Sequence, residues 1–393
     1  MAKKQAITRR RALLGLSALA GMGMFCTKAG GFKHINNQFL AIAFQQRNFS
    51  VRGNAPLRSR AAAKGLIYGA AASYSKLSSD REFAQKFAQE CAIVVPEAEL
   101  KWDALRPSPS RFDFTKADWI AKFARSHGML FRGHVLVWHE ALPKWFATAV
   151  NKQNAERMLV EHIRTVAGHY AGKIHSWDVV NEAVLPEDGR SDGLRNSPWL
   201  QFLGPNYIDL AFRVAAEADP HALLVYNDFG LDYQYEEPRR VAVLKLLERL
   251  KSGGSPVQAL GIQAHLWGDK NGTLNLKVLR KFLRDVASMN LKILITELDV
   301  TDKNLPLDVS VRDRLVAATY EDYLDTVLQE PAVIAVLTWG LSDRYTWLNW
   351  SNSRQRLDRW PARSLPLDND FKRKSAWNAI ARAFDAAPKR PST

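Results

Sequence analysis

The feature that most constrains the fold of this chain is a regular alternation of short apolar segments with longer segments of helical periodicity, which begins near Ala55. The short segments have the length and the β-branched content of strands, and there are eight of them, at residues 66–70, 93–96, 130–134, 176–181, 223–227, 259–264, 292–296 and 333–338. Segments with helical periodicity lie between them, at residues 81–89, 117–127, 155–170, 207–218, 238–251, 275–289 and 309–328. Because the strand segments are apolar on both faces, the pattern predicts an α/β protein with a parallel sheet covered by helices.

Eight repeats favour closure of this sheet into a (β/α)8 TIM barrel, a fold that commonly forms one unit of more than about 200 residues. The competing architecture is an open doubly wound sheet, which usually carries a glycine-rich phosphate turn after its first strand. The corresponding segment here, Tyr68-Gly-Ala-Ala-Ala-Ser73, contains a single glycine. We therefore predict one barrel domain over residues 55–384, preceded by a linker of unknown structure at 30–54 and followed by a tail at 385–393.

The formal charge of +15 at pH 7 is concentrated near the N-terminus. Residues 1–79 contain 13 of the 55 Lys and Arg residues and no Asp or Glu, which leaves 42 basic side chains against 40 acidic ones in the remainder. A nucleic-acid-binding surface would need its basic excess on the folded domain. We therefore expect no nucleic-acid partner.

The N-terminus has the layout of an export signal, in which a basic segment precedes a short apolar one. The segment Thr8-Arg9-Arg10-Arg11-Ala-Leu-Leu14 leads directly into an apolar stretch at residues 13–25, and it resembles the twin-arginine signal. That stretch is too short for a comfortable membrane span. We predict a signal peptide over residues 1–29, export to the periplasm or the medium, and no membrane attachment after the signal is removed.

The cysteine content agrees with this route. Cys26 lies at the end of the predicted signal, so an exported chain would keep only Cys91 and could form no internal disulfide. Cys91 begins the apolar segment Cys91-Ala-Ile-Val-Val95, which predicts a small buried hydrophobic side chain. We expect the exported chain to be a monomer.

Polar and aromatic residues follow the predicted strands, at the positions where a barrel carries its functional groups. These residues are Glu97, His134, Asn181, Glu182, Asn227, Asp228, Gln263, His265, Glu297 and Trp339. Two carboxylates among them, Glu182 and Glu297, each close a long apolar strand. Either one alone could be a salt bridge at a strand end, because buried carboxylates are costly unless they are paired. Two such acids on strands four and seven favour a functional pair.

A pair of carboxylates suits the cleavage of glycosidic bonds. One carboxyl group must protonate the departing oxygen while the other attacks the anomeric carbon or activates water there. Tryptophan suits the same chemistry, because indole faces pack against the apolar faces of sugar rings. The chain has 12 tryptophans, of which four lie near predicted strand ends (Trp102, Trp138, Trp339 and Trp347), while Trp119 and Trp377 fall on helical patterns that predict core positions.

Histidine raises the question of a metal site. His134 and His139 are five residues apart, which places them on opposite faces of an extended strand, a poor arrangement for one metal ion. We therefore predict no metal and no cofactor, with a barrel metallohydrolase as the alternative. A serine hydrolase is excluded because the sequence contains no Gly-x-Ser-x-Gly motif.

Seven motifs together resemble one known family. They are Glu97-Ala-Glu-Leu-Lys101-Trp102, Gly133-His134-Val-Leu-Val-Trp138-His139, Trp177-Asp-Val-Val-Asn181-Glu182-Ala183, Tyr226-Asn-Asp-Phe229, Gly261-Ile-Gln263-Ala-His265-Leu266, Thr296-Glu297-Leu-Asp299-Val300 and Trp339-Gly-Leu-Ser-Asp-Arg-Tyr-Thr-Trp347. In this order, across roughly residues 55–384, they resemble the family 10 glycoside hydrolases, the retaining endo-1,4-β-xylanases.

The resemblance implies a role for each matching residue. Glu182 would be the acid/base and Glu297 the nucleophile, while His265 would orient Glu297. Asn181 would bind the 2-hydroxyl of the sugar at the cleavage site with help from Gln263. The remaining matches would line the subsites on the glycone side, namely Glu97, Lys101, His134, Trp138, Trp339 and Trp347. The implied partner is xylan or a xylo-oligosaccharide.

Two residues depart from the family pattern. Ala98 stands where the family usually has Asn, and Gly230 replaces an Asn that commonly follows the Tyr-Asn-Asp motif. Each departure removes a side chain that can bond to a sugar hydroxyl. Two alternatives to the xylanase stay open at this point. One is a related β-1,4-glycanase that acts on glucan or a mixed polymer, and the other is a non-catalytic carbohydrate-binding barrel.

Overall fold

The computed structural model describes residues 47–269 and 274–390. The predicted signal peptide and residues 30–46 of the predicted linker lie outside the described residues. Among the helices of the described part, none combines the length and the apolar character that a membrane span requires.

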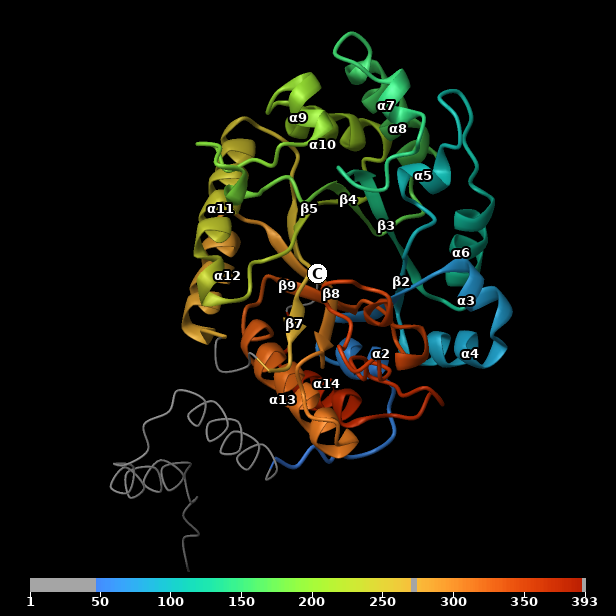
Figure 1. Ribbon diagram of the computed structural model, residues 1–393, viewed down its shortest axis with the longest axis vertical. Helices are drawn as coiled ribbons and strands as arrows, with labels where there is room; N and C mark the ends of the chain where they lie inside the picture. Colours follow the sequence, from blue (N-terminus) through green and yellow to red (C-terminus); the bar gives the residue numbers. More distant parts are fainter. Residues whose placement is uncertain (1–46, 270–273, 391–393) are drawn as a thin grey trace, which may run out of the picture. The chain divides into compact units, whose positions relative to one another are not determined.

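The described residues form a closed parallel barrel, as predicted (Figure 1). Its sheet has the order β6-β5-β4-β3-β2-β1-β9-β8-β7, and β6 also pairs with β8, which closes the ring. The strands are β1 (Ile67–Ala72), β2 (Ile93–Pro96), β3 (Leu130–Val137), β4 (Ser176–Asn181), β5 (Leu223–Asp228), β6 (Ala259–Ile262), β7 (His265–Trp267), β8 (Lys292–Thr301) and β9 (Val333–Thr338). All their ladders are parallel, so the carboxyl ends of the strands meet at one end of the barrel.

One predicted strand, at residues 259–264, is interrupted in the structure. β6 ends at Ile262 and β7 starts at His265, and both halves pair with the long strand β8. Ala264 between them has a φ of 60°, in the left-handed region that a regular strand does not use. The break therefore arises from the local backbone at Gln263 and Ala264, which apolar periodicity does not reveal.

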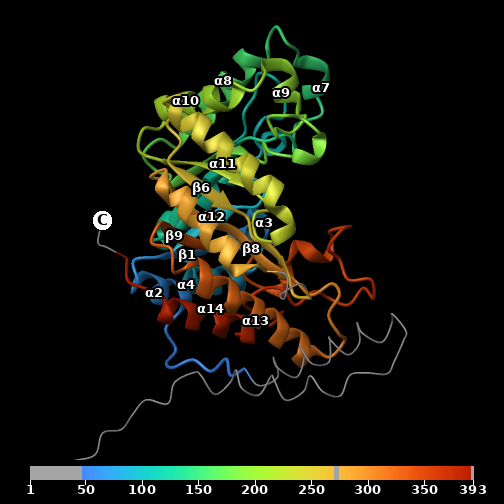
Figure 2. The ribbon, with the colours of Figure 1, turned by 90° about the vertical axis from the view of Figure 1, so that its left-hand side faces the viewer.

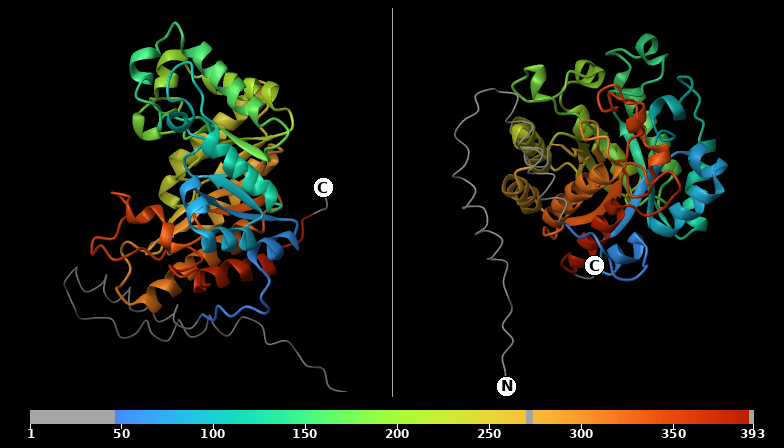
Figure 3. Two further views of the ribbon diagram at one scale, coloured as in Figure 1. Left: turned by 90° about the vertical axis from the view of Figure 1, so that its right-hand side faces the viewer. Right: turned by 60° about the horizontal axis from the view of Figure 1, so that its bottom comes forward.

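The seven predicted helices are present, with ends shifted by a few residues. They are α4 (Arg81–Glu90), α6 (Thr115–Ser126), α8 (Ala155–His169), α10 (Tyr207–Ala218), α11 (Glu237–Ser252), α12 (Leu276–Ser288) and α13 (Val309–Val327). The helix α14 (Ser375–Ala386) joins them, and Figure 2 shows α11 and α12 side by side across the strands. The two further views in Figure 3 show helices around the strands on the other sides as well.

Five shorter helices were not predicted. They are α2 (Leu57–Ala62), α3 (Tyr74–Ser79), α5 (Trp102–Leu105), α7 (Phe146–Ala149) and α9 (Pro198–Leu203). Each has at most six residues. A helix this short completes fewer than two turns, so it shows no apolar periodicity that a sequence pattern can detect.

The interior of the barrel is apolar below its carboxyl-terminal end. Its buried cluster combines small and branched side chains from six strands, Ala71, Ile93, Val95, Val225, Ala259, Leu294, Ala335 and Leu337, and Trp339 packs against it. Gly133 on β3 illustrates how tight the wall is, because a Cβ at this position would lie 2.0 Å from the indole of Trp177. Cys91 is buried, as predicted.

Both ends of the described chain are fixed to the barrel. Within the predicted tail, the Arg390 guanidinium is buried and donates to the carbonyls of Val333 at 3.0 Å and Leu328 at 2.9 Å. Near the other end, Arg47 pairs with Asp322 of α13 at 2.7 Å.

Candidate active site

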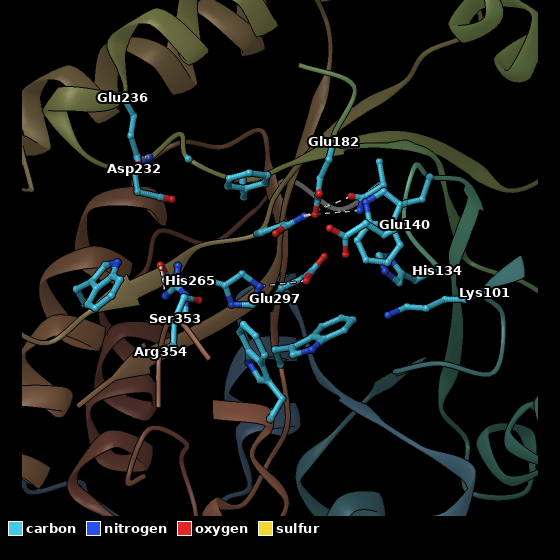
Figure 4. Close-up of a pocket in the computed structure, with 18 residues that line it drawn as sticks. Lys101, His134, Glu140, Glu182, Asp232, Glu236, His265, Glu297, Ser353 and Arg354 are labelled. Atoms are coloured by element: carbon cyan, nitrogen blue, oxygen red, sulfur yellow. Dashed lines mark hydrogen bonds and ion pairs between the residues drawn. The ribbon is translucent and has the colours of Figure 1, made fainter. Parts of the chain in front are cut away.

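A cavity of about 520 Å³ opens at the carboxyl-terminal end of the barrel (Figure 4). It brings together ten residues that the sequence singled out, Lys101, His134, Trp138, Asn181, Glu182, Gln263, His265, Glu297, Trp339 and Trp347. Eight more residues line it. The sequence singled out Gly230 among them as a departure from the family pattern and gave the other seven no role, namely Glu140, Phe229, Asp232, Glu236, Trp267, Ser353 and Arg354. Most of these eight follow β5 or lie in the loop after β9, where strand patterns say little.

Two predicted residues lie elsewhere. Glu97 is not among the residues that line this cavity, and its carboxylate pairs with Lys76 Nζ at 2.6 Å. Burial raises the pKa of Glu97 although Lys76 opposes the shift, and its contact with substrate stays a prediction. Trp102 is buried in the core, where its ring stacks on His162 at 3.7 Å. Of the two tryptophans predicted in the core, Trp377 is buried and Trp119 is half-buried.

Glu297 projects from β8 and accepts two hydrogen bonds. Asn227 Nδ2 donates to Oε1 at 2.9 Å, and His265 Nε2 lies 3.2 Å from Oε2. Burial by itself would raise the pKa of Glu297. The bond from His265, the charges of His134 and His265 and the bond from Asn227 together outweigh burial, so this pKa lies below its usual value. Glu297 is therefore held as a carboxylate with fixed orientation, which is the state that a nucleophile requires.

His265 connects Glu297 to a second buried acid, Asp299. Its Nδ1 lies 3.0 Å from Asp299 Oδ1, and the other oxygen of Asp299 accepts from Trp347 Nε1 at 2.7 Å. Burial lowers the pKa of His265, yet the two acids raise it to about 9. Asp299 was missed as a site residue, although its place two residues after Glu297 puts it on the same face of the strand.

Glu182 follows β4 and lies opposite Glu297 in the cavity (Figure 4). Its Oε1 accepts from Gln263 Nε2 at 2.9 Å and from Asn181 Nδ2 at 3.2 Å. Burial raises the pKa of Glu182, and the negative charge of Glu297 acts in the same direction, while the bond from Gln263 opposes both. Glu182 is thus the group that keeps its proton to higher pH, as a general acid must.

Asn227 at the end of β5 holds this arrangement together. Its Nδ2 donates to Asn181 Oδ1 as well as to Glu297, and its Oδ1 accepts from Thr296 Oγ1 at 2.7 Å. The neighbouring strand β6 leaves room for the Asn227 side chain because residue 261 is glycine. A Cβ at Gly261 would lie 2.2 Å from Asn227 Oδ1. The sequence placed Asn227 at a strand end but gave it no role.

The opposite wall is built from β3 and the segment before α5. His134 Nδ1 lies 2.9 Å from Asp178, which also binds Arg132. Lys101 Nζ lies 4.9 Å from the ring centre of Trp138, so an ammonium and an indole are presented together. The sequence gave Asp178 no role of its own, because it lies inside a strand and appeared only as a member of a family motif.

Within residues 47–269 and 274–390, no three His, Cys, Asp or Glu side chains are grouped as metal ligands would be. Among the described contacts of His139, the nearest acid is Glu140 at 3.7 Å. The predicted absence of a metal and of a cofactor stays a prediction.

Two buried carboxyl groups in one cavity therefore have pKa values shifted in opposite directions, which is a typical signature of an acid and a nucleophile that act as a pair. Indoles from Trp138, Trp339 and Trp347 line the same cavity and offer flat apolar faces. Cleavage of a glycosidic bond needs such a pair of carboxyl groups, and the indoles can pack against the sugar rings beside that bond.

Comparisons with known proteins give the same answer. Residues 56–383 match glycosyl hydrolase family 10. The β-1,4-xylanase of Dictyoglomus thermophilum is 35 % identical over 302 residues, which cover 73 % of this chain and 80 % of that protein. Native xylanase 10B from Thermotoga maritima superposes with a TM-score of 0.77 at 32 % identity, covering 84 % of this chain and 98 % of that one. Xylanase 10B from Thermotoga petrophila, solved in complex with xylobiose, gives the same TM-score over 86 % of this chain and 99 % of that one, at 32 % identity. With the barrel, the paired carboxylates and the family match in agreement, the chain belongs to glycosyl hydrolase family 10.

Proposed function

We propose that this protein is a retaining endo-1,4-β-xylanase. The observation that carries the proposal is the pair of buried carboxyl groups with opposite pKa shifts, Glu182 raised and Glu297 lowered, in one cavity of a family 10 barrel. The relatives named β-1,4-xylanase support xylan as the polymer, and the xylobiose complex of the Thermotoga petrophila enzyme supports binding of xylo-oligosaccharides.

The reaction runs in two displacements. In the first, Glu297 Oε attacks the anomeric carbon while Glu182 gives its proton to the departing glycosidic oxygen, which leaves a glycosyl ester on Glu297. In the second, the ionised Glu182 takes a proton from water as that water attacks the anomeric carbon and releases Glu297. Two inversions give net retention, and for this mechanism we expect the two carboxyl groups to lie about 5 Å apart.

The protonation states of the two acids during the reaction follow from their surroundings. Glu182 begins protonated because burial and the charge of Glu297 disfavour its ionised form. When Glu297 becomes an ester its charge disappears, so the pKa of Glu182 falls and Glu182 can act as a base in the second step. His265 and Asn227 hold the Glu297 carboxylate in place throughout.

The cavity walls suggest how the sugar is held. Asn181 bonds to Glu182 and, through Asn227, is linked to Glu297, so we assign it to the 2-hydroxyl, and we assign Trp339 and Trp347 to stacking on the sugar rings. Lys101 and His134 can donate to hydroxyls on the glycone side. Ala98 and Gly230 stand where the family pattern has Asn, so the hydrogen bonds that an amide side chain could make to substrate at these two positions are expected to be absent.

The test compares substrates and stereochemistry. Purified protein should release reducing sugar from xylan much faster than from carboxymethylcellulose, and proton NMR of early products should show the β-anomer first. Faster release from carboxymethylcellulose would indicate a related glycanase instead. Binding of xylan without any release would indicate a carbohydrate-binding barrel.

We further propose export by the twin-arginine route, on the basis of the segment Thr8-Arg9-Arg10 and the apolar stretch after it. Replacement of both Arg9 and Arg10 by Lys should leave folded, active enzyme inside the cell. Unchanged export of this double variant would contradict the proposal.

A further inference from the structure

The backbone of Glu182 has a conformation that side chains rarely adopt. Its φ is 56°, in the left-handed region, where a Cβ lies too close to the following carbonyl oxygen. β4 ends at Asn181, so this conformation turns the chain at the very residue that carries the raised pKa. Such a conformation persists only when surrounding groups fix it.

Two hydrogen bonds fix this conformation, one on each side of the Glu182 Cα. The Glu182 N–H donates to the carbonyl of Asn227 on β5 at 2.9 Å. The Glu182 carbonyl accepts from Arg195 Nε at 2.7 Å. The first bond comes from the neighbouring strand, whereas the second comes from a side chain 13 residues further along.

Arg195 is brought back to Glu182 by a closed loop. Val184 and Leu194 form an antiparallel bridge, Leu185 N–H donates to Gly193 at 2.9 Å, and Arg195 N–H donates to Ala183 at 2.8 Å. The loop is also packed from outside, because a Cβ on Gly193 would lie 2.7 Å from Ala242 of α11. The loop therefore returns the backbone of Arg195 to that of Ala183, next to Glu182.

The guanidinium also acts on the Glu182 carboxyl through its charge. The charged groups that interact electrostatically with this carboxyl include Glu297 from β8, Asp228 from β5 and Arg195, and Glu140 lines the same cavity (Figure 4). Burial and Glu297 raise the pKa of Glu182, and Arg195 opposes them. Arg195 Nη2 is buried and has no hydrogen-bond partner among the described residues, so the guanidinium is not neutralised at that nitrogen by a carboxylate.

We propose that Arg195 is a positioning residue for the general acid: it holds Glu182 in the left-handed conformation that directs its carboxyl group toward the departing oxygen. The proposal rests on the proposed function, which assigns the proton transfer to Glu182. Arg195 touches the Glu182 backbone and not the reacting atoms, so its effect should appear only in reactions that need the proton.

The test uses Arg195→Ala and Arg195→Lys with two substrates, xylan and an aryl xylobioside with a very acidic phenol. Arg195→Ala should lower kcat/KM on xylan by on the order of a hundredfold, and it should affect formation of the glycosyl-enzyme from the aryl substrate far less. Because Arg195 lowers the pKa of Glu182, its removal should move the alkaline limb of kcat/KM to higher pH. Arg195→Lys keeps the charge, so it should leave that limb near its original position.

Arg239 provides the matched control. It stacks on the same ring as Arg195, with Phe229 at 4.3 Å from Arg239 and 5.8 Å from Arg195, and it bonds to Val184 in the same loop at 3.3 Å. It makes no hydrogen bond to Glu182 among the described contacts. Arg239→Ala should therefore change kcat/KM on both substrates equally. It should not move the alkaline limb to higher pH, because the charge of Arg239 lowers the pKa of Asp228, whereas that of Arg195 lowers the pKa of Glu182 itself. Melting temperatures show whether each variant is folded.

Equal losses on both substrates for Arg195→Ala, or an alkaline limb that does not move, would overturn the proposal. The same contrast produced by Arg239→Ala would overturn it too, because the effect would then belong to the loop as a whole. Failure of the proposed function looks different. In that case the unaltered enzyme would not cleave xylan, or Glu182→Ala would lose activity equally on xylan and on the aryl xylobioside.

Discussion

Asn227 Nδ2 lies 2.9 Å from Glu297 Oε1, and the same nitrogen lies 2.9 Å from Asn181 Oδ1. Asn181 in turn donates to Glu182 at 3.2 Å. The two carboxyl groups are therefore linked through two amides that come from different strands. Amides are neutral donors, so this link orients both acids without adding a charge, and the positive charge beside Glu297 comes from His265.

The first prediction concerns Asn227→Ala. Loss of this bond removes a contribution that lowers the pKa of Glu297, so the acid limb of kcat/KM should move to higher pH. Because the side chain is buried and its partners would be left unsatisfied, the free energy of unfolding should fall by about 1–3 kcal/mol. Thr296→Val is the control, since it removes only the bond that Asn227 accepts. An acid limb that stays in place in Asn227→Ala would contradict the role given to this bond.

The second prediction concerns Glu182→Ala. Cleavage of xylan should fall by on the order of a hundred- to ten-thousand-fold, because its sugar leaving group needs a proton. Formation of the glycosyl-enzyme from an aryl xylobioside with a very acidic phenol should suffer far less, since that phenol departs unaided. Single-turnover measurements on the two substrates check this. Equal losses would assign Glu182 a different role.

The third prediction concerns Glu297→Ala, which removes the nucleophile. Both substrates should lose all turnover, because no glycosyl ester can form. Added azide should restore reaction of the aryl substrate by direct attack in the vacated space, and the product should be the α-glycosyl azide. A β-glycosyl azide, or turnover without azide, would be inconsistent with Glu297 as the nucleophile.

The fourth prediction concerns the pH dependence of stability through His265. Its pKa is raised to about 9 in the folded protein by Asp299 and Glu297 against the effect of burial, compared with about 6.5 in an unfolded chain. A raised pKa means that the stabilisation is complete below about pH 6.5 and is lost as pH rises through about 9. Asp299→Asn should lower this pKa and reduce the loss of stability between pH 6.5 and 10.

Urea unfolding of both proteins across this range measures the effect. Groups other than His265 titrate alike in both proteins, so the difference between their free energies of unfolding isolates the effect of His265. Asp299 also binds Trp347 at 2.7 Å, a bond that Asn can still accept, so the variant keeps that wall of the cavity. Identical slopes for the two proteins would show that His265 is not the group responsible.

Local sequence patterns were sufficient to predict the barrel and the positions of its reactive groups. Apolar runs and helical periodicity are local properties, and burial on both faces of each strand leaves few alternatives to a closed parallel sheet. Once the strands were located, the rule that barrels work at the carboxyl ends of their strands pointed to Glu182 and Glu297, and the structure places both in one cavity.

The contacts of these groups, by contrast, depend on how distant segments fold together. The partners of Asn227 lie 46 and 70 residues away, on strands whose order and register no local pattern encodes. The same holds for Asp178 beside His134 and for Arg195 at the backbone of Glu182. Two glutamates with one intrinsic pKa become an acid and a nucleophile because burial, charge and hydrogen bonds differ at each, and those differences exist only when distant segments are folded together.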